Sequence, residues 1–426
     1  MYKNNPSFVN SPDGIIRSAT DPYWQGLRNG STPPSIYSLF GNVGAWYGYS
    51  TKEEKTQTSF KATGSADIKS HEVSFGFEFE QRNDSYWQFN AWRNIWSLMR
   101  LQANKHIQER DLANPNALYV DGVYQGVVDY DRKYNADEQS YFDRSLREKL
   151  NKPIDGTEWL DIDNYDPSTY TLDLFSPDEL LNDGNNYVLY YGYDIYGNKL
   201  TTNPSLDEFF NGKDDNGIYK REIRAFQPIY TAGYIQDKFA IEDLIFNIGL
   251  RIDRYDANQK VLKDKYSLYE TFTRGSDGAA LIDNAEYIPS TIGDDWVVYV
   301  NDAFQPTSIV GYRDGDSWYD ASGTPISDPS ILAEAAGGSI APYIVNSGAA
   351  KINQIGKEAF EDYAPEVVFM PRIAFSFPIS DEAQFFAHYD VLTQRPPTGS
   401  RLNPIDYLYW VERATDGRFN NPNLKP

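Results

Sequence analysis

The sequence predicts an all-β fold, an antiparallel β-barrel segment of the kind that crosses a membrane. Three observations point to it: strict apolar/polar alternation in several segments, connections that are either very short or very long, and an aromatic content of 15% with 33 Tyr and 23 Phe. Aromatic residues favour strands, whereas the abundant Asp, Asn and Gly favour turns. A chain of 426 residues is long for one compact domain unless that domain is a large β-structure.

The clearest predicted strand covers residues 244–255, where apolar residues share one parity and polar residues the other. At about 3.3 Å per residue a dozen residues extend about 40 Å, enough for the roughly 9–11 tilted residues that cross a bilayer. The same two-faced pattern recurs in residues 60–68, 73–80, 373–379 and 385–391. Glu78 and Glu80 alternate with Phe77 and Phe79, so we expect them on a water-facing lumen side rather than in a catalytic pair.

The connections fall into two length classes. Short links at residues 69–71, 242–243 and 380–382 predict tight hairpins. The other connections are very long, with roughly 145 residues between Arg82 and Ile229 and roughly 105 between Asn258 and Pro365, far above the usual loop length. Short turns on one side and long loops on the other are typical of outer-membrane barrels.

The long loops are expected to contain short helices. Ser176, Pro177 and Glu179 form the pattern of a helix cap and capping box, with Gly184 as a stop. Apolar spacing predicts further helices in residues 137–150 and 91–107, which we expect to serve loop packing. Residues 314–329 are rich in turn-forming residues and show no periodicity.

Composition excludes several functions. With 39 Lys and Arg against 61 Asp and Glu, the net charge of −22 argues against a nucleic-acid partner. There is no cysteine and there are three histidines, His71, His106 and His388, none in a triad pattern. Residues 161–164 and 214–217 could bind calcium but are more typical of solvated turns. We therefore expect no catalytic, cofactor-binding or metal-ligating residues, no cofactor, and no enzyme activity.

Several segments resemble the strands of a known family. They are residues 71–82 (HEVSFGFEFEQR), 230–239 (YTAGYIQDKF), 247–253 (NIGLRID), 371–378 (PRIAFSFP) and 421–426 (NPNLKP). In this order they are similar to TonB-dependent outer-membrane receptors, in particular the large Bacteroidota receptors that carry a carboxypeptidase-regulatory-like N-terminal domain. The resemblance covers nearly the whole chain.

This resemblance implies that residues 1–426 are part of a barrel domain of 22 strands, of which about seven or eight are found here. No stretch of about 18 apolar residues exists, and residues 1–6 lack the features of a signal peptide. The plug domain, the signal peptide and the C-terminal strands of the family are not found in the sequence. We therefore expect an internal fragment in which Met1 is an internal or artificial start.

The function implied by the resemblance is active transport in the bacterial cell outer membrane. Loops would capture an extracellular ligand, and the periplasmic protein TonB would supply energy through regions missing here. The implied partners are membrane lipid, TonB, the ligand and a surface lipoprotein; the ligand's identity is open, and the acidic loops mildly favour a cation-bearing, peptide or glycan ligand.

Two alternatives remain open on the sequence. A secreted β-rich carbohydrate-binding or adhesion module would share the acidic charge, the tyrosines and the lack of cysteine. Its loop tryptophans, Trp159, Trp296, Trp318 and Trp410, could stack on sugars. A β-type glycoside hydrolase would need two carboxylates about 5–10 Å apart in a cleft. In the module each strand's apolar face would pack on a second sheet, whereas the barrel segment predicts one exposed apolar band.

Overall fold

The computed structural model describes residues 48, 50–89, 92–276, 289–352, 354–380, 382–411 and 419–426. All of them except Gly48 belong to one compact unit, Tyr49–Pro426. Strands account for 41% of the structure and helices for 19%, so the chain is mostly β, as the alternating sequence pattern predicts.

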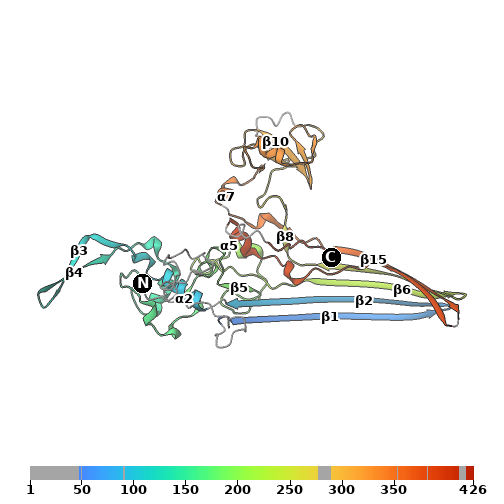
Figure 1. The fold of residues 1–426 in the computed structure, drawn as a ribbon, viewed down its shortest axis with the longest axis horizontal. Coiled ribbons are helices and arrows are strands. Elements are labelled where there is room, and N and C mark those ends of the chain that lie inside the picture. The colour runs from blue at the N-terminus through green and yellow to red at the C-terminus, as the bar shows by residue number, and fades with distance from the viewer. Residues whose placement is uncertain are drawn as a thin grey trace, which may run out of the picture. The chain divides into compact units, whose positions relative to one another are not determined.

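The largest sheet is antiparallel and curled, and its six long strands run side by side in the order β1-β2-β6-β7-β15-β16 (Figure 1). A seventh, short strand, β5 (Val188–Tyr191), pairs with the end of β2. The long strands are β1 (Ser50–Ile68), β2 (His71–Phe89), β6 (Ile229–Ile241), β7 (Leu244–Asp256), β15 (Glu366–Ser380) and β16 (Ala383–Asp390). Each segment in which the sequence alternates is therefore a strand of this sheet.

The turns and the long loops lie at opposite ends of these strands. Two residues join β1 to β2 and two join β6 to β7, and β16 begins three residues after β15 ends. Because all neighbouring long strands are antiparallel, these turns share one end of the sheet, and the connections 90–228 and 257–365 leave from the other. The predicted division into short turns and long loops is confirmed.

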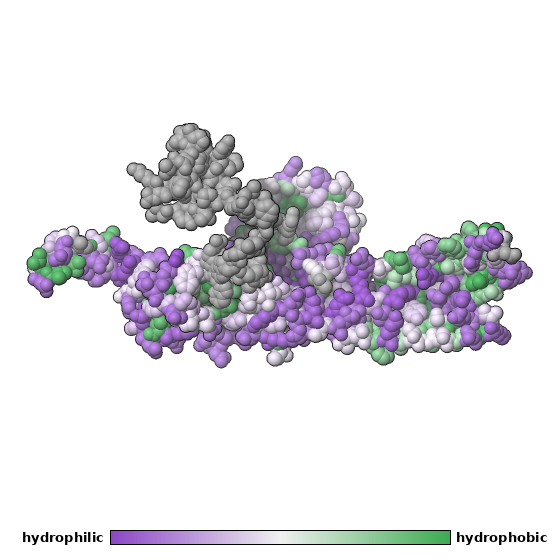
Figure 2. All heavy atoms as spheres, turned by 60° about the horizontal axis from the view of Figure 1, so that its bottom comes forward, coloured by the Kyte–Doolittle hydropathy of each residue, from purple (hydrophilic) through white to green (hydrophobic). Residues whose placement is uncertain are grey.

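One face of the sheet near the turns is an apolar band. Phe75, Ile235, Leu250 and Pro371 lie in register across four strands, and the first three expose 53%, 55% and 38% of their surface. Along β7 the band runs from Leu244 to Ile252, about 26 Å at 3.3 Å per residue. In Figure 2, hydrophobic residues gather toward the turn end of the strands, at the right.

An aromatic row follows the turn end of this band. The rings of His71, Phe239, Phe246, Phe375 and Phe385 touch in sequence across five strands, with neighbouring ring centroids 5.1 to 6.4 Å apart. We call this set the aromatic row. The Nδ1 atom of His71 also lies 2.7 Å from a carboxylate oxygen of Asp237, a polar contact within the band. Edge and tilted ring contacts of this kind add to the stability of strand pairing.

The long loops contain an apolar core, in which helices pack against β5 and the end of β2. Trp87 and Phe89 of β2 are buried there. Ser176 and Glu179 form the predicted capping box. The predicted helix 137–150 begins later, at Tyr141, because Ser140 caps it, and the helix predicted for 91–107 ends at Gln102. The helices in this core are α2 (Trp92–Gln102), α3 (Tyr141–Lys149), α4 (Pro177–Leu181), α5 (Leu206–Asn211) and α8 (Pro404–Leu408).

The second long connection contains a small sheet of its own, in the order β12-β11-β10-β9-β13. Val298, Val300 and Tyr312 are buried in its core. Residues 314–329, which are rich in turn-forming residues and show no periodicity, contain β11 and β12, and these two strands pair as a hairpin. The strands are β9 (Val297–Val300), β10 (Ile309–Asp314), β11 (Ser317–Asp320), β12 (Pro325–Ile326) and β13 (Ala341–Pro342).

The remaining elements are small. β3 (Arg110–Val120) and β4 (Val123–Arg132) form a hairpin, and β8 (Lys260–Leu262) pairs with β14 (Phe360–Asp362). Two short helices, α6 (Ser330–Ala335) and α7 (Ser347–Lys351), lie in the second long connection. No helix among the described residues has the length and apolar character needed to cross a membrane.

Candidate functional site

Opposite the apolar band, the sheet carries a charged face. Arg251 of β7 pairs with Glu78 of β2 at 3.3 Å and with Asp253 at 2.7 Å. The Arg251 guanidinium also donates to the Tyr230 hydroxyl at 2.6 Å, and this hydroxyl donates to Asp253. The network spans three adjacent strands, so each charge that is withdrawn from water has an opposite charge or a hydrogen-bond partner.

The chain after β16 turns back over this charged face. Arg395 reaches Glu80 of β2 at 2.8 Å, and its guanidinium stacks on the Tyr230 ring at 3.5 Å. β16 and β2 are separated by three strands in the sheet, so the segment must cross them. We call residues 391–402 the return segment; its far end is held by Gln259, which accepts from the Leu402 amide at 2.9 Å.

Glu80 anchors the return segment to the sheet. It is 7% exposed and accepts from both Arg82 and Arg395 through the same oxygen. Two guanidinium partners offset the desolvation of one carboxylate, and charge-assisted hydrogen bonds of this kind are about twice as strong as neutral ones. Glu78 and Glu80 both lie on the charged face, as the alternation predicts, whereas no sequence pattern indicates their partners.

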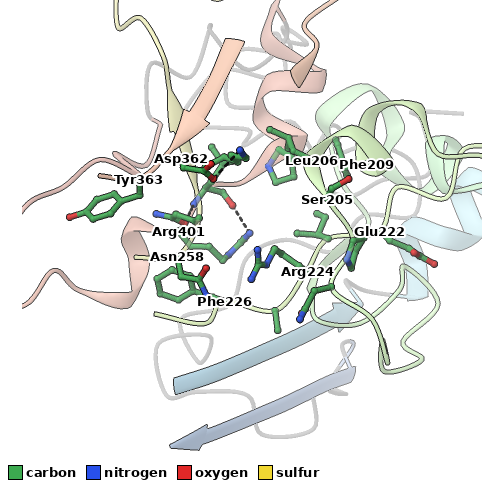
Figure 3. A pocket seen from close by; sticks show the side chains of 18 of the residues that line it. Ser205, Leu206, Phe209, Glu222, Arg224, Phe226, Asn258, Asp362, Tyr363 and Arg401 are labelled. Atoms are coloured by element: carbon green, nitrogen blue, oxygen red, sulfur yellow. Dashed lines mark hydrogen bonds and ion pairs between the residues drawn. The ribbon is translucent and has the colours of Figure 1, made fainter. Parts of the chain in front are cut away.

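A cavity of about 370 Å³ lies where the long loops meet the loop end of the sheet. Five separate stretches of chain form it: residues 203–209 around the start of α5, residues 222–226 before β6, residues 256–260 after β7, residues 362–363 at the end of β14, and residues 401–404 at the end of the return segment. Its apolar wall consists of Leu206, Phe209, Ile223, Phe226, Leu402 and Pro404. We call this cavity the loop-base pocket (Figure 3).

Two arginines point into the loop-base pocket, Arg224 and Arg401 (Figure 3). Arg401 donates to the Leu402 carbonyl at 2.7 Å and stacks on the Tyr191 ring at 4.2 Å. Arg224 donates to the Gln227 side chain at 3.2 Å, and its Nε is buried without a hydrogen-bond partner. Neither guanidinium forms an ion pair within the described part of the chain.

Burial lowers the pKa of Arg401 to about 10, and the charge of Asp406 offsets part of this shift. The group therefore stays cationic at neutral pH, although the protein desolvates it. A desolvated cation without an ion-pair partner is unfavourable, because burial removes water without supplying an opposite charge. Such groups are enriched at binding sites.

A buried cluster of charged residues lies in the core of the long loops, apart from the charged face of the sheet and from the loop-base pocket. Asp143 and Arg147 have no exposed side-chain surface and pair at 2.8 Å. Arg147 also donates to the Glu158 carbonyl at 2.9 Å, and Asp143 accepts from the Asn104 amide at 2.8 Å. His106 Nδ1 lies 3.4 Å from Asp143 without a hydrogen bond among the described residues, and its Nε2 contacts the Gly156 carbonyl at 3.4 Å; the sequence did not indicate either neighbour. Burial lowers the pKa of His106, and the negative charge of Asp143 offsets part of this shift.

The other residues considered from the sequence do not form reactive groupings. His71 is the first residue of β2, and His388 lies on β16, distant in sequence from any nucleophile pattern. Asp161 and Asp214 each accept from backbone amides of their own turns. Over the ranges that the structure describes, no three acidic or histidine side chains gather as metal ligands.

The four loop tryptophans all contact side chains of this chain. Trp159 remains 49% exposed, whereas the other three are packed in ring clusters. The contacts are Arg132 on Trp159, Tyr319 on Trp296, Tyr266 and Tyr299 around Trp318, and Phe419 on Trp410. These rings therefore stabilise the loops, and only Trp159 offers a large free surface among them.

Comparison with known proteins gives no assignment. No family model matches the chain. No curated protein and no solved structure is significantly similar to it. The functional argument therefore rests on the residues and the geometry described above.

Proposed function

We propose that this chain is part of the β-barrel of a TonB-dependent outer-membrane receptor, which takes up an extracellular ligand through a plugged barrel. The proposal places the apolar band against lipid and the charged face toward the lumen. Short turns would then face the periplasm and long loops the exterior. TonB, the ligand and a surface lipoprotein are the partners proposed with it, and the activity is transport rather than catalysis.

The observation that carries the proposal is the exposed apolar band opposite a charged face. Phe75, Phe77, Ile248 and Leu250 are all exposed on one side of the sheet, and no described segment packs over them. A soluble sandwich would bury that side against a second sheet. The band runs about 26 Å along the strand, which at the roughly 35–45° tilt of barrel strands projects to about 20 Å, comparable with the roughly 25 Å apolar belt of outer-membrane barrels.

Two further features agree with this orientation. Aromatic girdles mark the membrane interfaces of barrels, and the aromatic row lies next to the short turns. The charged network of Arg251, Glu78 and Asp253 would face water in a lumen, where such charges are common. The secreted-module alternative predicts a covered apolar face, which the described residues do not provide.

Single-cysteine labelling tests the proposal on a chain that contains no native cysteine. Phe75→Cys lies on the apolar band, and its neighbour Ser74→Cys lies on the opposite face at the same depth, which makes a matched pair. With an environment-sensitive fluorophore and lipid vesicles, we expect brominated lipid to quench the label at position 75 and aqueous iodide to quench the label at position 74. Equal quenching of both labels by iodide, with none by lipid, contradicts the proposal.

A further inference from the structure

Three basic and three acidic residues line the loop-base pocket. The chain carries a net charge of −22, yet the two side chains that Figure 3 shows directed into the pocket are Arg224 and Arg401. Both belong to segments that are held in place, since Ile223 and Phe226 are buried on either side of Arg224 and Leu402 is buried next to Arg401. The arginines are thus positioned by a packed core rather than by mobile surface chain.

The acidic residues of the pocket leave these arginines uncompensated. Asp362 is paired with Lys260 at 2.9 Å, and Asp256 with Arg254 at 3.0 Å. Glu222 also lines the pocket, but Figure 3 shows its carboxylate directed away from the two guanidinium groups. Two cations therefore face the pocket without an ion pair in the portion of the chain described.

One part of the wall is apolar, and the remainder is polar. Phe209, Ile223 and Phe226 are at most 5% exposed, and Leu206, Leu402 and Pro404 complete the surface. A concave, mostly apolar cavity of about 370 Å³ with a few convergent polar groups has the character of a small-molecule site. The guanidinium group presents a planar fork of donors that fits a carboxylate through two parallel hydrogen bonds.

We propose that the loop-base pocket binds a small organic carboxylate, with the carboxylate on Arg224 and Arg401 and an apolar body against Phe209 and Phe226. The buried Nε of Arg224, which has no hydrogen-bond partner among the described residues, gains an acceptor in this complex. Arg401 regains the opposite charge that its burial denies it, in line with its lowered pKa. The site goes beyond the proposed transport function and does not depend on membrane insertion.

Calorimetric titration of the full chain in non-ionic detergent tests the site with three probes: phenylacetate, its neutral analogue phenylacetamide, and inorganic phosphate. We expect phenylacetate to bind at least about tenfold more tightly than the amide, because charge-assisted hydrogen bonds form only with the carboxylate. Equal binding of acid and amide, or no binding of either, overturns the proposal. Binding of phosphate without binding of phenylacetate overturns it as well, since it indicates a general anion site without an apolar subsite.

Variants then locate the binding. Arg224→Gln leaves a shorter, neutral side chain that can still donate a hydrogen bond but lacks the charge and the fork of donors, and we expect it to weaken phenylacetate binding about tenfold or more. Arg100→Gln is the matched control, because Arg100 is an exposed residue of α2 that pairs with Asp163 and does not line the pocket. Unchanged affinity in Arg224→Gln refutes the assignment. The acid-to-amide difference is measured on the unchanged chain, so the proposal remains testable even if a variant fails to fold.

Discussion

A lysine in the middle of the apolar band distinguishes a lipid-facing surface from an ordinary exposed one. Ile235 of β6 lies near the centre of the band and is 55% exposed. Its neighbour Gln236 lies at nearly the same depth on the opposite face, so Gln236→Lys is a control with the same change of charge. At the middle of a bilayer a lysine on the lipid side of a barrel costs about 2–4 kcal/mol, which corresponds to roughly 30-fold to several hundredfold in an equilibrium constant.

Vesicle flotation measures this difference. Each variant is mixed with phosphatidylcholine vesicles at increasing lipid concentration, and the fraction that floats gives a partition constant. We expect Ile235→Lys to lower the constant at least about 30-fold, and Gln236→Lys to change it about twofold or less, since surface substitutions stay within about 0.5 kcal/mol. If both variants partition alike, the band does not face lipid and the reasoning from its exposure is refuted.

Three further predictions concern the buried charges. Asp143→Asn leaves the buried Arg147 without its ion-pair partner. We expect urea titrations to show that the free energy of unfolding of the loop core is lowered by about 3–5 kcal/mol, and a loss below about 1 kcal/mol would contradict the pairing. Because burial lowers the pKa of His106 in the folded state, the folded protein binds fewer protons than the unfolded chain. We therefore expect the free energy of unfolding to fall as the pH drops below about 6.5, by up to about 1.4 kcal/mol per pH unit. In denaturation series from neutral to mildly acidic pH, the His106→Gln variant should lack this contribution to the pH dependence. Arg395→Gln removes one of the two cations on Glu80, so hydrogen exchange measured by mass spectrometry should become faster in the return segment and stay unchanged in β7.

The sequence predicts the long strands well because their pattern is local. The two-residue period in residues 244–255 fixes both the existence of β7 and the side to which each side chain points. Glu78 and Glu80 could be placed on the charged face for the same reason. The capping box of Ser176 and Glu179 is likewise a local signal, and the structure contains it.

The candidate site could not be predicted because its partners are distant in sequence. Arg395 and Glu80 are 315 residues apart, and no periodicity connects them. Arg224 and Arg401 come from a connecting stretch and from the return segment, so only the folded loops bring them to one pocket. The small sheet was missed because strands of two to six residues, separated by turn residues, are too short to show alternation.

The outer edge of β1 has a consequence for the order of folding. β1 has 19 residues and pairs with β2, and among the described residues no strand pairs with its other edge. In an antiparallel strand about half of the backbone amides point to each side, so a stretch as long as the apolar band leaves roughly four or five donors along that edge. Hydrocarbon supplies no acceptor for them, at several kcal/mol for each unsatisfied group. Under the proposed membrane placement, a neighbouring strand has to dock on β1 before this edge enters lipid, so strand assembly would precede contact with lipid.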